Sequence, residues 1–361
     1  LTSAPGMVYI PAGTIFYKSS QDSSNVGKNV SVSAFFMDET EVTNKQYREF
    51  INWVADSVAV VDYIQDDRYF LETSQSDAED MNKEAGERFI NWNAVKKESP
   101  LWRSKNPEIQ EKLQPMLTSK AGKRVLNSAL LNYRFSYIKM DGRNNDQYVT
   151  DTVGVMPIED VWSTDFPNAQ MKTMDDNYFY HKSFDHNPVV GVTWKQARAY
   201  ADWRGKQMMA NLQKNSYLRG LQLTFSLPTE AQWQYAAEGK LDPLDTIQRT
   251  RLTIKDRKSD KKKLAINFKQ GEGTYSRDGS TFTVPVKAYT PNAFGVYNMA
   301  GNVSEWTLDA FSPSSVEFVH DLNPVLLYDA NDKDSYTLKR KVVRGGSWKD
   351  NGSMLNTDDR N

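Results

Sequence analysis

The chain contains no cysteine among its 361 residues, and this absence constrains the fold more than any other count. It excludes disulfide bonds, thiolate metal sites and cysteine nucleophiles from the printed sequence. A loop-rich chain without disulfides must be held by an apolar core and by hydrogen bonds to its backbone groups. We therefore expect side chains, and ions held by oxygen ligands, to satisfy the backbone outside helices and strands.

Size and composition indicate a globular protein. The 361 residues equal about 2.4 typical domains, which fits one large domain with an insertion or two smaller ones. Hydrophobic residues at 39% and charged residues at 25% exclude wholesale disorder and fibrous repeats. A net charge of -1 gives no overall field for nucleic acid, and no apolar run is long enough to span a bilayer.

Three segments share one design, in which a short apolar strand runs into Thr-x-x-Gln and then into an apolar pattern of helical period. In such a capping box the Thr side chain bonds the amide three residues on, and the Gln bonds back. We predict helices after the boxes Thr43–Gln46, Thr193–Gln196 and Thr229–Gln232. The strands predicted before them are Phe35–Met37, Val189–Val192 and Leu223–Leu227.

Most of the remaining chain lacks periodicity and carries short apolar stretches among Gly, Asn, Asp and Ser, which is typical of a loop-rich α+β domain. We predict a single domain over residues 1–361 with an insertion at about 62–180. Within the insertion we expect a charged helical stretch near 77–93 and a strand pair at about 133–137 and 148–153.

Two loops offer hard oxygen ligands. Asn298 and Glu305, with Gly301 and nearby backbone carbonyls, could form a cage for a cation such as Ca²⁺. The alternative is an Asn-rich turn whose side chains bond only backbone. Upstream, Asn267 and Asp278 bracket a Gly-rich loop and either hold a second ion or close a turn.

The remaining polar features favour structural roles. His181 and His186 are not at the i, i+4 spacing of a helical zinc motif, so we expect a solvated or stacked pair. The basic segment Lys255–Lys263 lacks interleaved aromatic residues, which favours a solvated loop over a nucleic-acid site. Val342–Trp348 predicts a strand that ends in a glycine turn.

Six blocks in order resemble the formylglycine-generating enzyme family, also called sulfatase-modifying factors. The blocks are Met7–Gly13, Met37–Asn44, Pro188–Trp194, Leu227–Ala237, Gly295–Trp306 and Val343–Trp348. The resemblance covers most of the chain except the insertion, and it implies the family's irregular α+β fold, which is related to C-type lectins. It also implies structural calcium at two sets of residues. One set is Asn298, Gly301, Val303 and Glu305, and the other is Asn267, Phe268, Asp278 and Ser280.

The active enzymes of this family bind copper through two cysteines shortly after the Gly-Gly-Ser-Trp block. Counted without gaps, Leu355 and Arg360 occupy those places here. We therefore expect no copper and no catalytic residue, so that the chain would be a pseudoenzyme of the family.

Within the family, three stretches resemble the gliding-motility and type IX secretion lipoproteins of the PorK or GldK kind, with the J-type sister lipoprotein as an alternative. The stretches are Phe35–Ile51, Asn177–Val192 and Val342–Asp350. The resemblance implies a lipoprotein at the periplasmic face of the outer membrane, anchored by a lipid upstream of Leu1. It further implies a homo-oligomeric ring with an N-type partner (GldN or PorN) and other secretion components.

Our leading hypothesis is therefore a non-catalytic ring subunit that binds no nucleic acid. A second hypothesis is a residual enzyme that uses polar residues near Arg344, Ser347 and Trp348 without thiols. A third is a glycan- or peptide-binding module, because a fold of this kind presents variable loops on a stable core.

Overall fold

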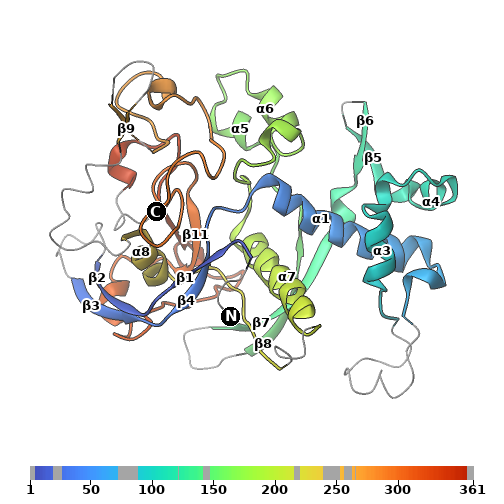
Figure 1. The fold of residues 1–361 in the computed structure, drawn as a ribbon, viewed down its shortest axis with the longest axis horizontal. Helices are drawn as coiled ribbons and strands as arrows, with labels where there is room; N and C mark the ends of the chain where they lie inside the picture. The colour runs from blue at the N-terminus through green and yellow to red at the C-terminus, as the bar shows by residue number, and fades with distance from the viewer. Residues whose placement is uncertain are drawn as a thin grey trace. The chain divides into compact units, whose positions relative to one another are not determined.

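The protein is described by a computed structural model, which covers residues 5–18, 27–71, 88–120, 122–140, 147–214, 220–238, 253–255, 262–264 and 266–355. The chain divides into two compact units (Figure 1). Unit 1 comprises residues 1–45, 136–149 and 158–361, and unit 2 comprises residues 46–135 and 150–157. The predicted insertion at 62–180 thus includes most of unit 2 and also residues that pack in unit 1.

The strands are short, and in the described ranges they form six two-stranded sheets. The pairs are β1 (Met7–Ile10) with β4 (Phe35–Asp38), β2 (Gly13–Lys18) with β3 (Gly27–Val32), β5 (Leu117–Lys120) with β6 (Lys123–Leu126), β7 (Asn132–Lys139) with β8 (Gln147–Gly154), β9 (Thr253–Lys255) with β10 (Lys262–Leu264), and β11 (Glu305–Ala310) with β12 (Lys341–Arg344). The strand pair predicted within the insertion corresponds to β7 and β8. The α+β, loop-rich class predicted from the sequence is confirmed.

A helix begins at each of the three predicted capping boxes, and the described ranges contain further helices without such a box. The helices are α1 (Asn44–Val58), α3 (Trp92–Glu98), α4 (Pro107–Lys112), α5 (Val161–Asp165), α6 (Lys172–Asn177), α7 (Trp194–Leu212), α8 (Glu230–Glu238) and α9 (Ser315–Phe318). Both reciprocal bonds of the box are present between Thr193 and Gln196 at the start of α7, and between Thr229 and Gln232 at the start of α8. In the described ranges, no helix is both long enough and apolar enough to cross a membrane.

Two of the predicted strands do not form. The segments 189–192 and 223–227 lie in irregular backbone, whereas β4 forms before α1 as predicted. The amide of Val189 bonds the carbonyl of Val42, and the amide of Leu223 lies 3.3 Å from the sulfur of Met209. Apolar residues there pack without a neighbouring strand, which periodicity alone could not reveal. Of the predicted helical stretch 77–93, residues 77–87 lie outside the described ranges, and α3 begins only at Trp92.

The core of unit 1 lies around α8, which contacts β2, β3, β11 and β12 (Figure 1). Trp233 of α8 is fully buried there with apolar side chains of the strands, among them Ile10, Ile15 and Val30. The helix therefore gathers strands from both ends of the sequence, and its polar residues are carried into the same buried region.

Unit 2 has its own core. One face of α1, formed by Tyr47, Phe50, Ile51 and Val54, is buried as its i, i+3, i+4, i+7 spacing predicts. Phe50 packs edge-on against Tyr133 of β7, with ring centroids 5.3 Å apart. These contacts give unit 2 an apolar centre formed from its own residues.

Candidate functional site

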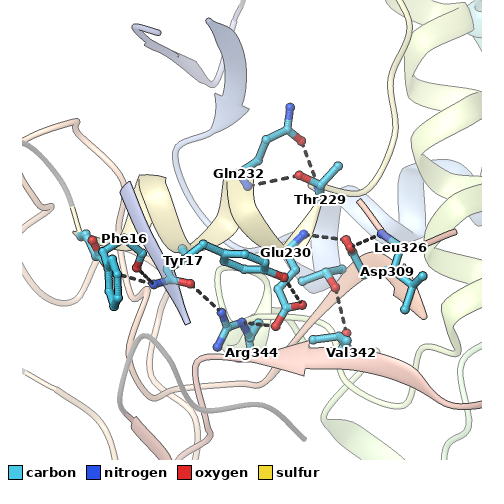
Figure 2. Close-up of polar contacts among 12 residues, drawn as sticks. Phe16, Tyr17, Thr229, Glu230, Gln232, Asp309, Leu326, Val342 and Arg344 are labelled. Atoms are coloured by element: carbon cyan, nitrogen blue, oxygen red, sulfur yellow. Dashed lines mark hydrogen bonds and ion pairs between the residues drawn. The ribbon is translucent and has the colours of Figure 1, made fainter. Parts of the chain in front are cut away.

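A fully buried ion pair lies at the centre of unit 1. The Nε atom of Arg344 in β12 lies 3.2 Å from Oε1 of Glu230 in α8, and neither side chain is exposed. Tyr17 of β2 donates its hydroxyl to Oε2 of Glu230 at 2.8 Å, and Arg344 donates through Nη2 to Gln234 at 3.2 Å (Figure 2). Buried charges are stable only when paired and hydrogen-bonded in this way. Arg344, near which the residual-enzyme hypothesis places its polar residues, is thus held inside the core.

The start of α8 is fixed by a second set of polar contacts (Figure 2). The amide of Glu230 donates to Oδ2 of Asp309 at 2.7 Å, and Leu326 donates to the other oxygen of Asp309 at 2.8 Å. Asp309 is 1% exposed, and its charge is compensated by the amide of Leu326 and by the Glu230 amide at the positive end of α8. These bonds fix the backbone from which the Glu230 side chain extends toward Arg344.

The loop that carries the first predicted cation set has left-handed backbone at three positions. Asn298, Gly301 and Asn302 have φ values of +49°, +79° and +61°. These three residues lie in the loop that leads into β11. Glu305 opens the strand, and Trp233 donates its ring N–H to Oε2 of Glu305 at 2.7 Å.

Glu41 is a residue that the sequence analysis missed. Its Oε2 accepts from the amide nitrogen of Asn298, and its Oε1 accepts from that of Asn302, both at 2.9 Å. Burial, followed by the nearby charge of Glu305, raises the pKa of Glu41 to about 8. Burial also raises the pKa of Glu305 to about 7. The sequence offered one indication, the acidic block at residues 38–41. That block did not show that Glu41 would contact a loop about 260 residues further along the chain.

The second predicted cation set also comes together in one loop. Asp278 accepts the amide of Phe268 on Oδ2 and the amide of Ser280 on Oδ1, each at 3.0 Å. Asn267 donates its side-chain nitrogen to the carbonyl of Phe282 at 2.9 Å, which turns its Oδ1 away from that carbonyl. The turn-closing role considered for Asp278 is therefore present.

Neither set is rich in charged ligands. In the described ranges, no group of three or more His, Cys, Asp or Glu side chains could hold a metal ion. Each predicted set instead offers one carboxylate with amide, hydroxyl or backbone oxygens, the hard ligands that suit calcium rather than zinc. His181 accepts the amide of Ser183 at 3.2 Å, which is a local structural bond.

The glycine turn after β12 leads into an aromatic cluster. Ser347 donates both its amide and its hydroxyl to Oδ2 of Asp350, at 2.8 and 2.6 Å. Trp348 is 6% exposed and stacks on Trp162, with centroids 5.7 Å apart. Leu355 lies at the turn, where a Cβ on Gly346 would approach it to 2.9 Å. Arg360, the other position matched to a family cysteine, lies outside the described residues, as do residues 256–261 of the basic segment.

Comparisons with known proteins identify the family of the chain. The family model described as "Sulfatase-modifying factor enzyme 1-like domain" matches residues 1–361. The formylglycine-generating enzyme of Streptomyces coelicolor is 34% identical over 174 residues, which are 47% of this chain and 45% of that protein. The corresponding enzyme of Thermomonospora curvata is 32% identical over 190 residues, 52% of this chain and 53% of that protein. The matches thus span about half the length of these relatives.

The names of these relatives correct the expectation that the chain is a pseudoenzyme. The prediction that the chain is a pseudoenzyme without catalytic function is wrong, because relatives at 32% and 34% identity are named as enzymes. The prediction relied on the missing cysteines, and these bear only on chemistry that needs a thiolate. A bovine relative, 31% identical over 169 residues (45% of this chain, 39% of that protein), is named an inactive formylglycine-generating enzyme, so the family includes both kinds.

Proposed function

The chain belongs to the sulfatase-modifying factor enzyme 1-like family, and from that premise we propose that it serves as an assembly subunit of type IX secretion and gliding-motility machinery. In this proposal it is a lipoprotein at the periplasmic face of the outer membrane, of the PorK or GldK kind. It forms a homo-oligomeric ring with an N-type partner and other secretion components. A fold does not specify a function, so the proposal depends on particular segments.

The observation that supports the proposal is that the three stretches that resemble those lipoproteins contact one another. Thr43 forms a bridge with Pro188, and the amides of Asn44 and Lys45 bond carbonyls of the 177–192 stretch at 2.9 and 3.1 Å. Tyr178 of that stretch packs in one cluster with Trp348 of the third. Segments separated by more than 100 residues thus form a single packed region, as expected if a subgroup-specific surface lies there.

Apolar side chains beside this region are exposed. Ile158 is 51% exposed and its amide bonds the carbonyl of Gly191, while Tyr180 is 39% exposed and donates to Glu159 at 2.5 Å. Exposed apolar groups that lie together are frequent at protein interfaces. We therefore assign the surface around Ile158 and Tyr180 to contacts with a neighbouring subunit.

The proposal is tested by mixing the full-length lipoprotein with a purified N-type partner and measuring particle mass. The wild-type protein should form large stoichiometric particles. The double substitution Ile158→Asp with Tyr180→Asp should reduce them at least tenfold at the same concentration, because charges at an apolar contact must be desolvated. The matched control is Phe318→Asp, which alters another exposed aromatic residue of unit 1 and should leave assembly intact. Failure of the wild-type protein to assemble would contradict the proposed function.

Calcium is the cofactor that we propose for the two loops. The residues fit it, because their oxygens are hard ligands and Glu305 is a buried carboxyl whose pKa burial raises, so that a hard cation would relieve the cost of ionising it. Asn298, Glu305 and the carbonyls of Gly301 and Val303 would hold the first ion. Asn267, Asp278, Phe268 and Ser280 would hold the second, and the ions would stabilise both loops.

The names of the relatives favour a second candidate, an enzyme that works without thiolates. Its polar groups would have to lie near the glycine turn, where Ser347 and Asp350 are already bonded to each other. The test is incubation with a cysteine-containing sulfatase peptide, followed by an aldehyde-reactive probe. Labelling above a heat-denatured control would support this candidate, and no labelling would count against it.

A further inference from the structure

We propose that the two cation sites, whose existence rests on the calcium assignment above, bind their ions cooperatively because Asn302 joins the two loops. Asn302 belongs to the first loop, between Gly301 and Val303, and yet bonds the second. Its side chain is not among the predicted ligands of either site. Its role would be to position the loops, so that order in one is transmitted to the other.

Asn302 and Asn267 are linked by a pair of hydrogen bonds. The backbone amide of Asn302 donates to the carbonyl of Asn267 at 2.8 Å, and the side-chain nitrogen of Asn267 donates to Oδ1 of Asn302 at 3.2 Å. Both residues are 1% exposed. The loops also touch at Gly301, where an added Cβ would lie 2.3 Å from the carbonyl oxygen of Asn267. A proposed ligand of each site is therefore in direct contact with the other loop.

The other side of Asn302 reaches Glu41. Its side-chain nitrogen donates to Oε1 of Glu41 at 2.9 Å, while Oε2 accepts from Asn298. Asn298 also donates to the carbonyl of Val286 at 2.9 Å, so its amide nitrogen is fixed and its Oδ1 faces away from Glu41. Glu41 thus orients a ligand of the first site and holds the residue that bonds the second.

Every hydrogen-bonding group of Asn302 is engaged. Besides these bonds, Oδ1 accepts the amide of Val284 at 2.9 Å, and the backbone carbonyl accepts the amide of Trp348 at 2.9 Å. The residue also holds a left-handed backbone with φ of +61°. A residue so constrained cannot shift alone, because moving it breaks bonds to both loops at once.

The sign of the coupling follows from this arrangement. An ion that orders one loop pays the ordering cost of the shared Asn302 and Asn267 bonds, so the second ion meets a loop already in place. Repulsion between two dications acts in the opposite direction, but each ion has a carboxylate beside it. We expect positive coupling of about 5- to 150-fold, the range usual for linked sites, and it must be equal in both directions.

The test is calorimetric titration of the chelator-treated full chain with Ca²⁺. The wild-type protein should bind two ions. Glu305→Gln should remove the first site and weaken the second, and Asp278→Asn should remove the second and weaken the first by the same factor. No binding by the wild-type protein would overturn the calcium assignment and the coupling with it. If the wild-type protein binds two ions but the remaining site of each single-site variant keeps its wild-type affinity, the coupling is overturned and the calcium assignment stands.

A third variant tests the role of Asn302. Asn302→Ala should leave two ions bound but make their affinities independent. The matched control is Asn292→Ala. It loses the bonds that the amides of Phe294 and Val296 donate to Oδ1 of Asn292, and the bond that Asn292 donates to the carbonyl of Ala236, without touching the pair between the loops. Coupling that survives Asn302→Ala would overturn the proposed path. If that variant fails to fold, the equality of the two factors in the single-site variants still decides whether the sites are coupled.

Discussion

Arg344 and Glu230 form a buried ion pair, and its contribution to the free energy of unfolding depends on the presence of both side chains. Removing one leaves an uncompensated charge in an apolar core, which typically costs about 3–5 kcal/mol of unfolding free energy. We predict a loss of that size for Arg344→Met, measured by urea unfolding. Adding Glu230→Leu should recover part of the loss, because the orphaned carboxylate is removed, although the hydroxyl of Tyr17 then lacks its acceptor.

The control for this prediction is an exposed pair on α7. Lys206 lies 2.7 Å from Asp202 at the i, i+4 spacing, and exposed pairs of this kind contribute little. Lys206→Met should therefore leave the unfolding midpoint nearly unchanged. A loss from Arg344→Met no larger than that from Lys206→Met would show that the buried pair does not stabilise the fold.

Glu305 tests the calcium assignment at the level of one side chain. Removing a ligand carboxylate weakens a site that exists only in the folded state, so the ion stabilises the variant less. We predict that Glu305→Ala lowers the melting temperature mainly in millimolar calcium, by about 1–2 °C for each kcal/mol lost in a chain of this length. The measurement is thermal unfolding in calcium and in chelator. Equal losses in the two conditions would contradict calcium binding at Glu305.

Sequence patterns identify candidate residues better than they identify contacts between residues that are far apart in the chain. Asn298, Glu305, Asn267 and Asp278 could be singled out because hard oxygen ligands stand near glycines in short loops. Glu41 and Asn302 could not, because their importance arises from contacts across about 260 positions, which no local spacing encodes. The role of Arg344 was likewise hidden, since an arginine beside a glycine turn suggests a cleft until Glu230 is placed next to it.

Among the elements, those with a local cause were predictable. The starts of α7 and α8 follow from capping boxes that need only four residues, and β12 ends at glycines with φ values of +91° and +65°. The predicted strands at 189–192 and 223–227 did not form because a strand needs a continuous ladder. In the described ranges the first segment has isolated contacts beside it, among them the bridge of Pro188 with Thr43 and the bond of Val189 to Val42, and no such ladder. Helix caps are local properties, whereas strand pairing is not.

The contact between α1 and the segment that follows α3 should depend on pH. Asp56 is 1% exposed and accepts from Ser99 at 2.5 Å and from the amide of Leu101 at 2.7 Å. Burial raises its pKa from 3.8 to about 6, although these two bonds lower it. Because the folded pKa exceeds the unfolded one, the stabilisation is full below about pH 3.8 and is lost as the pH rises through about 6.

Asp56→Asn should remove this dependence. The variant should gain at most about 3 kcal/mol over the wild-type protein between pH 4 and pH 7, which is the shift of about two pKa units expressed as free energy. The measurement is urea unfolding of both proteins in chelator across that range. Stability curves that stay parallel would show that Asp56 does not titrate in the folded protein.

At the scale of the whole molecule, the six ordered blocks were sufficient to identify the family and its loop-rich fold, because such blocks fix turns and buried glycines along the chain. They were not sufficient to assign activity. The missing cysteines led to the pseudoenzyme prediction, which the enzyme relatives contradict. Assembly, anchoring and partners depend on surfaces, and surfaces are the part of a sequence that packing constrains least.

The most direct test of the assembly proposal is isolation of the full-length lipoprotein from its native envelope in mild detergent, with mass spectrometry and particle sizing of what travels with it. The account predicts a large stoichiometric complex that contains an N-type partner and other secretion or motility components. A monomer reproducibly free of partners, under conditions that preserve other envelope complexes, would contradict it.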